Sequence, residues 1–395
     1  MKTKLFSILA ASALAFTACS TDNTVKPIDK KGEENLIGKI TKNTTLDANI
    51  EYTMTGAVYV QDGVTLTIPA GTVIKALDGG TDVYLMVERG GKIMANGTAD
   101  KPIVFTSKAA KPKEGDWGGV LINGKAPISG DAGKVTENNA EIGEAFKYGG
   151  SVVDDNSGIL NYVRIEYTGA RISEEKEHNG LTLNGVGNKT TLSNIYLAYG
   201  DDDAIEFFGG SVNATNILVV NCTDDMFDFT EGYSGTVKNV YGIREEGYLP
   251  VTVDPRGIEA DGNMDGKAPT HVNQSNFKVD GITIINNAPG LGANLTMHDV
   301  FKIRRGAKAT ITNAFVKFGP KTNVLDDKGA VVVDLADYTD KNGDAAAGTS
   351  IEYTIVKENN LDKAKVKTVT GTTATAKDGL KGADVSAFGW TKYKF

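Results

Sequence analysis

Acidic side chains that recur at a fixed interval are the residues of this sequence best suited to chemistry. Asp202-Asp203 and Asp224-Asp225 each precede a short apolar segment, and the two copies are offset by about 22 residues. If successive copies form neighbouring strands of one sheet, their carboxylates stand about 4.8 Å apart. Two ionised groups at that spacing repel by about 1 kcal/mol in water, and by more where water is excluded. A folded protein must offset this repulsion with bound protons, a basic neighbour or a bound cation.

Aligning the copies sorts the candidate side chains into columns. We expect two columns in the turns before the strands, His178, Asp202 and Asp224 in one and Asn179, Asp203 and Asp225 in the other. The strand face would carry a third column, Glu206, Asp228 and Glu259. The same alignment places Arg256 in line with Asp225, and Lys302 in line with Asp228. The candidate binding residues are His178, Asp202, Asp203, Asp224, Asp225, Arg256 and Lys302.

Carboxylates on adjacent strands also suit catalysis, because glycosidases work with paired carboxyl groups. Glu206 and Asp228, one strand apart, approach the separation found in retaining enzymes, whereas Glu206 and Glu259, two strands apart, approach that of inverting enzymes. A lyase would need a basic residue beside them, and Arg256 and Lys302 are candidates. If the protein is an enzyme, its candidate catalytic residues are Glu206, Asp228 and Glu259. The array of basic side chains that usually holds an acidic sugar is not evident.

Calcium is a candidate ligand of the acidic face, because clustered carboxylate oxygens are what Ca²⁺ prefers. Asp261, Asn263 and Asp265 match the start of a D-x-N-x-D-G calcium loop. The twelfth position is Val272, so the bidentate Glu of a complete loop is absent. Turn chemistry alone also favours Asp, Asn and Gly at such positions. For the acidic residues in general, the alternative is that they cap backbone N–H groups beside a solvated face.

The repeat predicts short parallel strands stacked in coils. Each copy places two inward apolar residues around one outward residue, as in 205–207 and 227–229. A second strand in the repeat begins with Asn, at Asn194, Asn216, Asn239 and Asn313. Coils of about 22 residues turned by Gly and Asn are typical of a parallel β-helix, and the regular Leu spacing of leucine-rich repeats is missing. We expect the Asn side chains to stack as a ladder, since each amide both donates and accepts.

The segments that carry the repeat also resemble a known group. They are Trp117–Gly124, Tyr162–Tyr167, Asn179–Leu183, Asp202–Gly210, Asp225–Asp228, Gly232–Tyr233, Arg256–Asp261 and Phe388–Thr391. Together they resemble exported bacterial lipoproteins of the Bacteroidetes type, which have a right-handed, pectin-lyase-like β-helix. The resemblance covers most of the chain from about residue 55. It implies an all-β fold, a right-handed parallel β-helix and export from the cytoplasm, and it implies no reaction.

The first residues are typical of an export signal. Lys2 and Lys4 precede an apolar stretch at 5–16, which is too short to span a bilayer well, and small residues then lead to Cys19. This pattern predicts a lipoprotein signal peptide over 1–18, lipidation of Cys19 and a polar tether over 19–48. An ordinary secretory signal is the alternative. We expect a lipid anchor in the outer membrane, with display at the cell surface as one option.

Composition and charge set the remaining limits. The chain has 395 residues, 40% of them hydrophobic, and a formal net charge of −8, which opposes nonspecific binding to nucleic acid. Apart from Cys19 the sequence contains a single cysteine, Cys222, so no internal disulfide is expected. We expect a β-helix over 49–335, with insertions near 126–157 and 244–278, followed by a β-rich C-terminal cap over 336–395. If the insertions meet over the acidic columns, they form a cleft.

These patterns favour a lipid-anchored envelope or cell-surface protein. It would bind a glycan, or another envelope or host macromolecule, through the acidic face and its loops, with Ca²⁺ as a candidate cofactor. A polysaccharide hydrolase or lyase is the alternative. Tyrosines at positions expected to be exposed could stack on sugar rings; these are Tyr196, Tyr199, Tyr233, Tyr241 and Tyr248.

Overall fold

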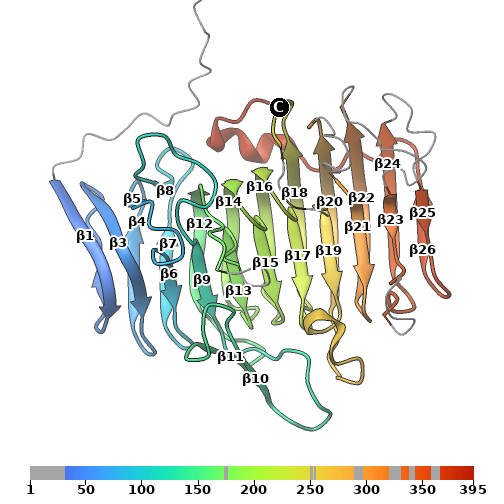
Figure 1. Cartoon of the computed structure of the whole chain (residues 1–395), viewed down its shortest axis with the longest axis horizontal. Coiled ribbons are helices and arrows are strands. Elements are labelled where there is room, and N and C mark those ends of the chain that lie inside the picture. The colour runs from blue at the N-terminus through green and yellow to red at the C-terminus, as the bar shows by residue number, and fades with distance from the viewer. Residues whose placement is uncertain are drawn as a thin grey trace, which may run out of the picture.

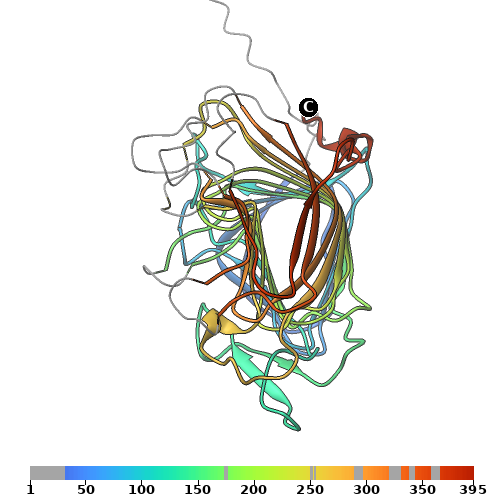
Figure 2. The same ribbon diagram turned by 90° about the vertical axis from the view of Figure 1, so that its right-hand side faces the viewer.

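The computed structural model describes residues 32–172, 177–249, 252, 255–288, 297–319, 331–337, 343–356 and 365–395. The chain winds into a long stack of coils in which nearly all strand pairs are parallel, as Figure 1 shows from the side and Figure 2 along the stack. The predicted all-β, right-handed parallel β-helix is confirmed. The predicted signal peptide, Cys19 and the first part of the tether lie outside the described residues.

The longer strands turn a corner of the coil, and two of them, β3 and β12, pair through their two halves with two different shorter strands. The first half of β12 pairs with β7 and its second half with β8. The longer strands are β1 (Gly32–Ile40), β3 (Ile50–Val60), β12 (Gly158–Glu166), β14 (Thr191–Gly200), β16 (Ala214–Cys222), β18 (Thr236–Arg244), β20 (Asn276–Asn286), β22 (Lys308–Phe318) and β24 (Ser350–Val356). Shorter strands on the same two faces are β2 (Thr44–Thr45), β4 (Thr65–Pro69), β5 (Val73–Ala76), β7 (Lys92–Asn96), β8 (Ile103–Ser107) and β26 (Thr373–Ala376).

The third face of the coil, which we call the site sheet, carries the predicted functional residues. Its short strands are β6 (Leu85–Val87), β9 (Val120–Asn123), β13 (Leu181–Asn184), β15 (Ile205–Phe208), β17 (Phe227–Thr230), β19 (Ile258–Asp261), β21 (Asp299–Arg304), β23 (Val331–Asp334) and β25 (Lys365–Lys367). The ends of β1 and β3 extend this sheet at the N-terminal side. Every neighbouring pair is parallel, so residues at equivalent positions of successive coils form straight columns.

Apolar side chains that point into the coil form a continuous core. The register pairs Leu181 with Ile205 and Phe227 with Ile258, as the repeat predicted. Aromatic rings stack along the axis, with ring centres 5.1 Å apart for Phe207 and Phe229. Each such buried side chain contributes about 1.5–3 kcal/mol to folding, which stabilises the stack without a disulfide.

The asparagine ladder lies at one corner of the coil. Asn194, Asn216 and Asn239 adopt left-handed backbone angles, with φ of 52°, 58° and 54°. The side-chain amide of Asn216 donates to Asn194 Oδ1 (2.9 Å), and that of Asn239 donates to Asn216 Oδ1 (2.7 Å). The predicted ladder is confirmed for these coils. Gly281 occupies the next coil, so Asn313 beyond it bonds instead to the C-terminal segment, accepting from the Lys381 backbone N–H (3.0 Å).

Both ends of the β-helix extend past the predicted boundaries. Strand β1 pairs with β3 from Gly32 opposite Ile50, so residues 32–48 form a first coil and not a tether. Among the described residues, this coil pairs with a neighbour on one side only, and most of its side chains are exposed or half-buried. Its sequence therefore shows little apolar periodicity. At the other end β24 pairs with β22, and β26 with β24, so coils continue beyond residue 335.

The last residues form a strap over the outside of the coils. The 3-10 helix η3 (Val385–Thr391) lies beside β14 and β16, next to the C-terminus in Figure 1. Phe388 and Trp390 are buried in an apolar cluster that includes Leu218 and Tyr241. Within the described residues, no helix combines the length and the hydropathy that crossing a membrane would require.

Candidate functional site

The outward side chains of the site sheet form the predicted column. The register places Glu206 opposite Asp228, Asp228 opposite Glu259, and Glu259 opposite Lys302. These side chains point away from the apolar core, but they are not freely solvated: Glu206 and Glu259 are each only 8% exposed. The repeat therefore predicted the alignment, and the covering of this column needs a separate explanation.

The covering comes from the two insertions. The first contains an antiparallel hairpin, β10 (Thr136–Asn139) and β11 (Lys147–Gly150), and the second contains the short 3-10 helix η1 (Met264–Gly266). Both lie at the lower edge of the stack in Figure 1. They meet where Gly130 pairs with Val272 and where the Asn138 amide approaches Met264 Sδ (3.5 Å). The two insertions therefore meet, which was the condition for a cleft over the acidic columns.

A buried anchor holds the hairpin on the site sheet. Glu231, just after β17, accepts hydrogen bonds from the Asn138 side-chain amide (2.7 Å) and from the Tyr148 hydroxyl. Glu231 has a left-handed backbone, with φ of 52°, which turns its side chain toward the hairpin. Burial and the neighbouring Glu231 carboxylate raise the pKa of Tyr148 well above its usual value, so this hydroxyl stays protonated and donates.

Between the insertions and the site sheet lies a small cleft. Its volume is about 210 Å³, which is below the range of about 300–1,000 Å³ typical of pockets for drug-sized ligands. The cleft suits one sugar unit or a hydrated ion better than a chain laid along the sheet. It is lined by Glu141, Glu206, Phe208, Asp228, Thr230, Glu259, Asp261, Met264, Arg304 and Arg305.

One end of the cleft is electrostatically balanced. Glu259 accepts hydrogen bonds from Arg256 and Arg304, and Asp261 pairs with Arg304 (3.0 Å) and Arg305 (2.6 Å). Burial alone would raise the pKa of Glu259, but the two guanidinium groups outweigh it and lower that pKa, so the carboxylate stays ionised. Each charge at this end therefore has a buried partner, as a stable buried ion pair requires.

The other end of the cleft has an excess of carboxylates. Ligand oxygens of Asp203, Glu206 and Asp228 lie within 4.8 Å of one another, and those of Asp202, Asp203 and Asp224 form a second such group. Burial, followed by repulsion from neighbouring carboxylates, raises the pKa values of Asp203 and Glu206 well above normal. The same two causes act on Asp228, where the nearby arginines compensate in part.

Two buried oxygens at this end lack a hydrogen-bond donor within the described part of the chain, Asp228 Oδ1 and Asn179 Oδ1. Asn179 is 2% exposed, and its side-chain amide nitrogen donates to the Glu206 carboxylate (2.5 Å). Because Asn179 Oδ1 belongs to the same amide group, it also lies close to the carboxylates. The backbone N–H of Asp225 donates to Asp203 Oδ1 (2.8 Å), which fixes that side chain in the turn. The turn before β15 thus holds oxygen ligands in a rigid frame.

The remaining predicted residues occupy the register expected of them but have varied surroundings. The Arg256 backbone N–H donates to Asp225 Oδ1 (2.6 Å), and Lys302 pairs with Asp334 (3.2 Å). His178 is buried against the Tyr84 ring, with ring centres 5.0 Å apart, and burial lowers its pKa to about 4. This imidazole is neutral and packed, and it is not among the residues that line the cleft.

Comparison with known proteins agrees with this architecture. A family model described as a pectate-lyase-like beta helix domain matches residues 38–393. The chain belongs to this family. A crystal structure of the Dettilon tailspike protein is similar at 12% sequence identity and a TM-score of 0.23, with 87% of this chain and 61% of that chain covered. No curated protein matches the chain.

Within this pectate-lyase-like β-helix, two of the three residues of the predicted calcium loop direct their oxygens to groups of the protein itself. The Asp261 carboxylate is engaged by Arg304 and Arg305, and Asn263 Oδ1 accepts from the Ala268 backbone N–H (2.8 Å). The side chain of Asp265 lies outside the described residues. The carboxylates that do converge come from successive coils and not from one loop, so the column alignment, and not the loop motif, was the useful signal.

Sequence reasoning missed some lining residues and misplaced several tyrosines. Glu141, Met264 and the two arginines reach the cleft from segments whose positions the repeat does not define. Tyr196, Tyr233 and Tyr241 are buried, so the expectation that they are exposed for sugar stacking was wrong. Tyr196 instead lies under the Arg164 guanidinium, 4.5 Å from its ring centre.

Proposed function

We propose that the protein binds a glycan at the cleft, with Ca²⁺ held by the carboxylate-rich end. The observation that carries this proposal is the convergence of Asp203, Glu206 and Asp228 oxygens within 4.8 Å. Oxygens on opposite sides of a Ca²⁺ ion are about 4.6–5.2 Å apart, because each lies at about 2.3–2.6 Å from the metal. The donor set fits the ion, since it consists of carboxylates with an amide oxygen, Asn179 Oδ1, beside them.

A bound Ca²⁺ would neutralise the crowded carboxylates and coordinate sugar oxygens. The protein's own residues supply the rest of the recognition. Arg304 and Arg305 stand at the far end of the cleft with guanidinium N–H groups directed by Glu259 and Asp261. Phe208 and Met264 give the cleft an apolar wall, against which the C–H face of a sugar ring can pack. The small volume favours the end or a side branch of a glycan.

We further propose that the protein is anchored in the bacterial outer membrane by lipid on Cys19. The support is the sequence of the first residues: a basic start, a short apolar stretch and small residues before a single Cys. The charged, polar segment that follows would hold the coils away from the bilayer. Radiolabelled palmitate incorporation that disappears in Cys19→Ala tests this point, and labelling that persists in the variant contradicts it.

The decisive experiment is a glycan array probed with Ca²⁺ and again with EDTA. We expect binding that EDTA abolishes and that Asp203→Asn or Asp228→Asn weakens by at least about tenfold. Glu352→Gln serves as the matched control, because Glu352 is a partly exposed carboxylate on β24, paired with Lys377, away from the cleft. Glycan binding that is unchanged by EDTA and by both cleft variants would refute the proposal.

Hydrolysis is the second candidate, favoured by the proximity of Glu206 and Asp228. Retaining glycosidases place their two carboxyl groups about 5–5.5 Å apart. The raised pKa of Glu206 suits a general acid, whereas Glu259 is held ionised by its arginines and suits a counter-ion. Release of reducing ends from a polysaccharide panel, lost in Glu206→Gln, would establish this reaction; no product from any member of the panel would exclude it for that panel.

A further inference from the structure

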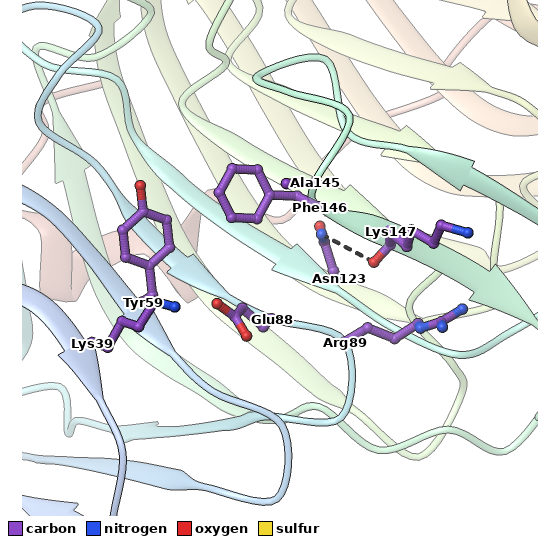
Figure 3. A pocket seen from close by; sticks show the side chains of 8 residues that line it. All are labelled: Lys39, Tyr59, Glu88, Arg89, Asn123, Ala145, Phe146 and Lys147. Atoms are coloured by element: carbon purple, nitrogen blue, oxygen red, sulfur yellow. Dashed lines mark hydrogen bonds between the residues drawn. The ribbon is translucent and has the colours of Figure 1, made fainter.

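A second and larger cavity opens on the same face of the β-helix, nearer the N-terminal end. Its volume is about 570 Å³, within the range of typical small-ligand pockets. Figure 3 shows the side chains that line it: Lys39, Tyr59, Glu88, Arg89, Asn123, Ala145, Phe146 and Lys147. They come from the first coils of the site sheet and from the hairpin insertion.

The hairpin separates this cavity from the acidic cleft. Tyr59 and Glu206 belong to one outward column, connected through Met86, Leu121 and Thr182. Four strand steps of about 4.8 Å put the two residues about 19 Å apart along the sheet. Met86 and Leu121 between them are buried in an apolar cluster with Tyr148 of the hairpin. A ligand of monosaccharide size in one cavity therefore does not contact the residues that line the other cavity.

Aromatic rings form one wall of the cavity. Tyr59 and Phe146 stack with ring centres 5.4 Å apart and planes inclined by 14°. The Tyr59 hydroxyl is hydrogen-bonded to the Tyr84 hydroxyl (2.8 Å), and the Tyr84 ring meets the Tyr59 ring edge-on. These contacts hold the aromatic wall in place before any ligand arrives, which lowers the entropy lost on binding.

Polar side chains of both hydrogen-bonding types surround that wall. Arg89 is anchored through one nitrogen to Glu137 (2.5 Å) and the Gly149 carbonyl (3.2 Å), which leaves further N–H donors on the guanidinium. In the described part of the chain, no hydrogen bond or ion pair engages the Glu88 carboxylate or the Lys39 ammonium group. In Figure 3 Glu88 lies between Tyr59 and Arg89, at the centre of the lining residues.

We infer that this cavity binds a pyranose sugar. A sugar ring has an apolar C–H face that packs on an aromatic wall, and its hydroxyl groups both donate and accept hydrogen bonds. Glu88 supplies acceptors, whereas Lys39, Arg89 and Lys147 supply donors, so the cavity matches a polyhydroxylated ring. A simple anion would be repelled by the Glu88 carboxylate, and a simple cation would be repelled by the three basic side chains. The lining therefore favours a neutral ligand over either ion. The inference holds independently of whether the acidic cleft binds a glycan.

Saturation-transfer NMR on the purified protein with a panel of monosaccharides and disaccharides tests this inference, followed by calorimetric titration of the strongest ligand. We expect transfer to ring protons of at least one sugar in EDTA as well as in Ca²⁺. Phe146→Ala and Glu88→Gln should each weaken binding by about tenfold, while Glu352→Gln on β24, away from both cavities, leaves it unchanged.

Three results would overturn the inference. The first is the absence of transfer to every sugar in the panel. The second is sugar binding that is lost in Glu206→Gln but preserved in Glu88→Gln, which would assign the sugar to the acidic cleft. The third is saturation by free amino acids or a dipeptide that displaces the sugar. Glu88→Gln carries the test if Phe146→Ala unfolds, because the backbone hydrogen bonds of Glu88 to Val60 and Gly91 are kept in this variant and, among the described residues, its side chain makes no hydrogen bond or ion pair.

Discussion

Asp228 and Glu259 occupy the same outward position on adjacent strands, yet their carboxyl groups have opposite electrostatic surroundings. Glu259 is engaged by Arg256 and Arg304, whereas Asp228 faces Glu206 and Asp203 and has a buried oxygen without a donor among the described residues. The boundary between the balanced and the carboxylate-rich ends of the cleft therefore runs between these two strands. One carboxylate column would in this way both stabilise the fold, at Glu259, and supply the proposed ligand oxygens, at Asp228.

Isosteric amide substitutions of this pair should change stability in opposite directions. Glu259→Gln removes the negative partner of two buried guanidinium groups and should lower the free energy of unfolding by about 3 kcal/mol. Asp228→Asn removes one of several repelling carboxylates and should raise stability when no divalent cation is present. Urea unfolding in EDTA at pH 8 measures both. Equal losses in the two variants would show that the ends of the cleft do not differ as described.

Stability without a divalent cation should fall as the pH rises. The pKa values of Asp202, Asp203, Glu206 and Asp228 are raised above the unfolded values of about 4, so the folded protein binds more protons than the unfolded chain in the range between them. The protein therefore gains stability as the pH falls through the raised values, down to about 4. Thermal unfolding in EDTA at pH 5, 6, 7 and 8 should show a decreasing midpoint.

Calcium should reduce this pH dependence, because it replaces the bound protons. Binding to the folded state alone adds about 2.7 kcal/mol when the free ion is at 100 times its dissociation constant. The effect should be largest at pH 8, where the carboxylates are most ionised, and should vanish in Asp203→Asn. A midpoint that does not respond to Ca²⁺ at any pH would rule out the ion at this site.

The repeat predicted the alignment of the site sheet because register in a β-helix is set by alternation and period together. A shift of one residue would turn Phe207 outward and Glu206 into the core, so the pairing of Glu206 with Asp228 followed from sequence alone. The position of Glu141 did not follow, because it lies in an insertion that has no copy in other coils. The first coil at 32–48 was missed because an edge coil needs little apolar surface.

The ion pairs of the cleft could not be read from the sequence for a different reason. Arg304 lies opposite Asp261 in the register, but its side chain also donates to Glu259. The second contact depends on the conformation and burial of the Arg304 side chain, which the repeat does not define. The calcium loop motif did not predict that the Asp261 carboxylate pairs with Arg304 and Arg305. Local motifs describe what a segment can do alone, and neighbouring coils decide which of its groups remain available.

Two substitutions in the asparagine ladder should measure the free-energy cost of backbone strain separately from that of lost side-chain hydrogen bonds. Asn216→Gly keeps the left-handed backbone but loses the amide contacts to Asn194 and Asn239, and should cost about 1–2 kcal/mol. Asn216→Ala loses the same contacts and also places a Cβ at φ of 58°, which adds about 1 kcal/mol. Chemical denaturation of both variants measures the difference. An alanine variant as stable as the glycine variant would show that the corner carries no strain.

The C-terminal strap should stabilise the coils by covering an apolar outer surface. Phe388 is fully buried among Leu218, Tyr241 and their neighbours, so Phe388→Ala should lower the free energy of unfolding by about 3–5 kcal/mol. Phe395 is 50% exposed at the end of the same segment and provides a matched control, for which we expect a loss below about 1 kcal/mol. Urea unfolding measures both variants.

Dye binding by 8-anilinonaphthalene sulfonate should increase in Phe388→Ala, because the loosened strap exposes the tyrosine and leucine side chains beneath it. Equal, small effects of the two substitutions would mean that the coils are stable without the strap.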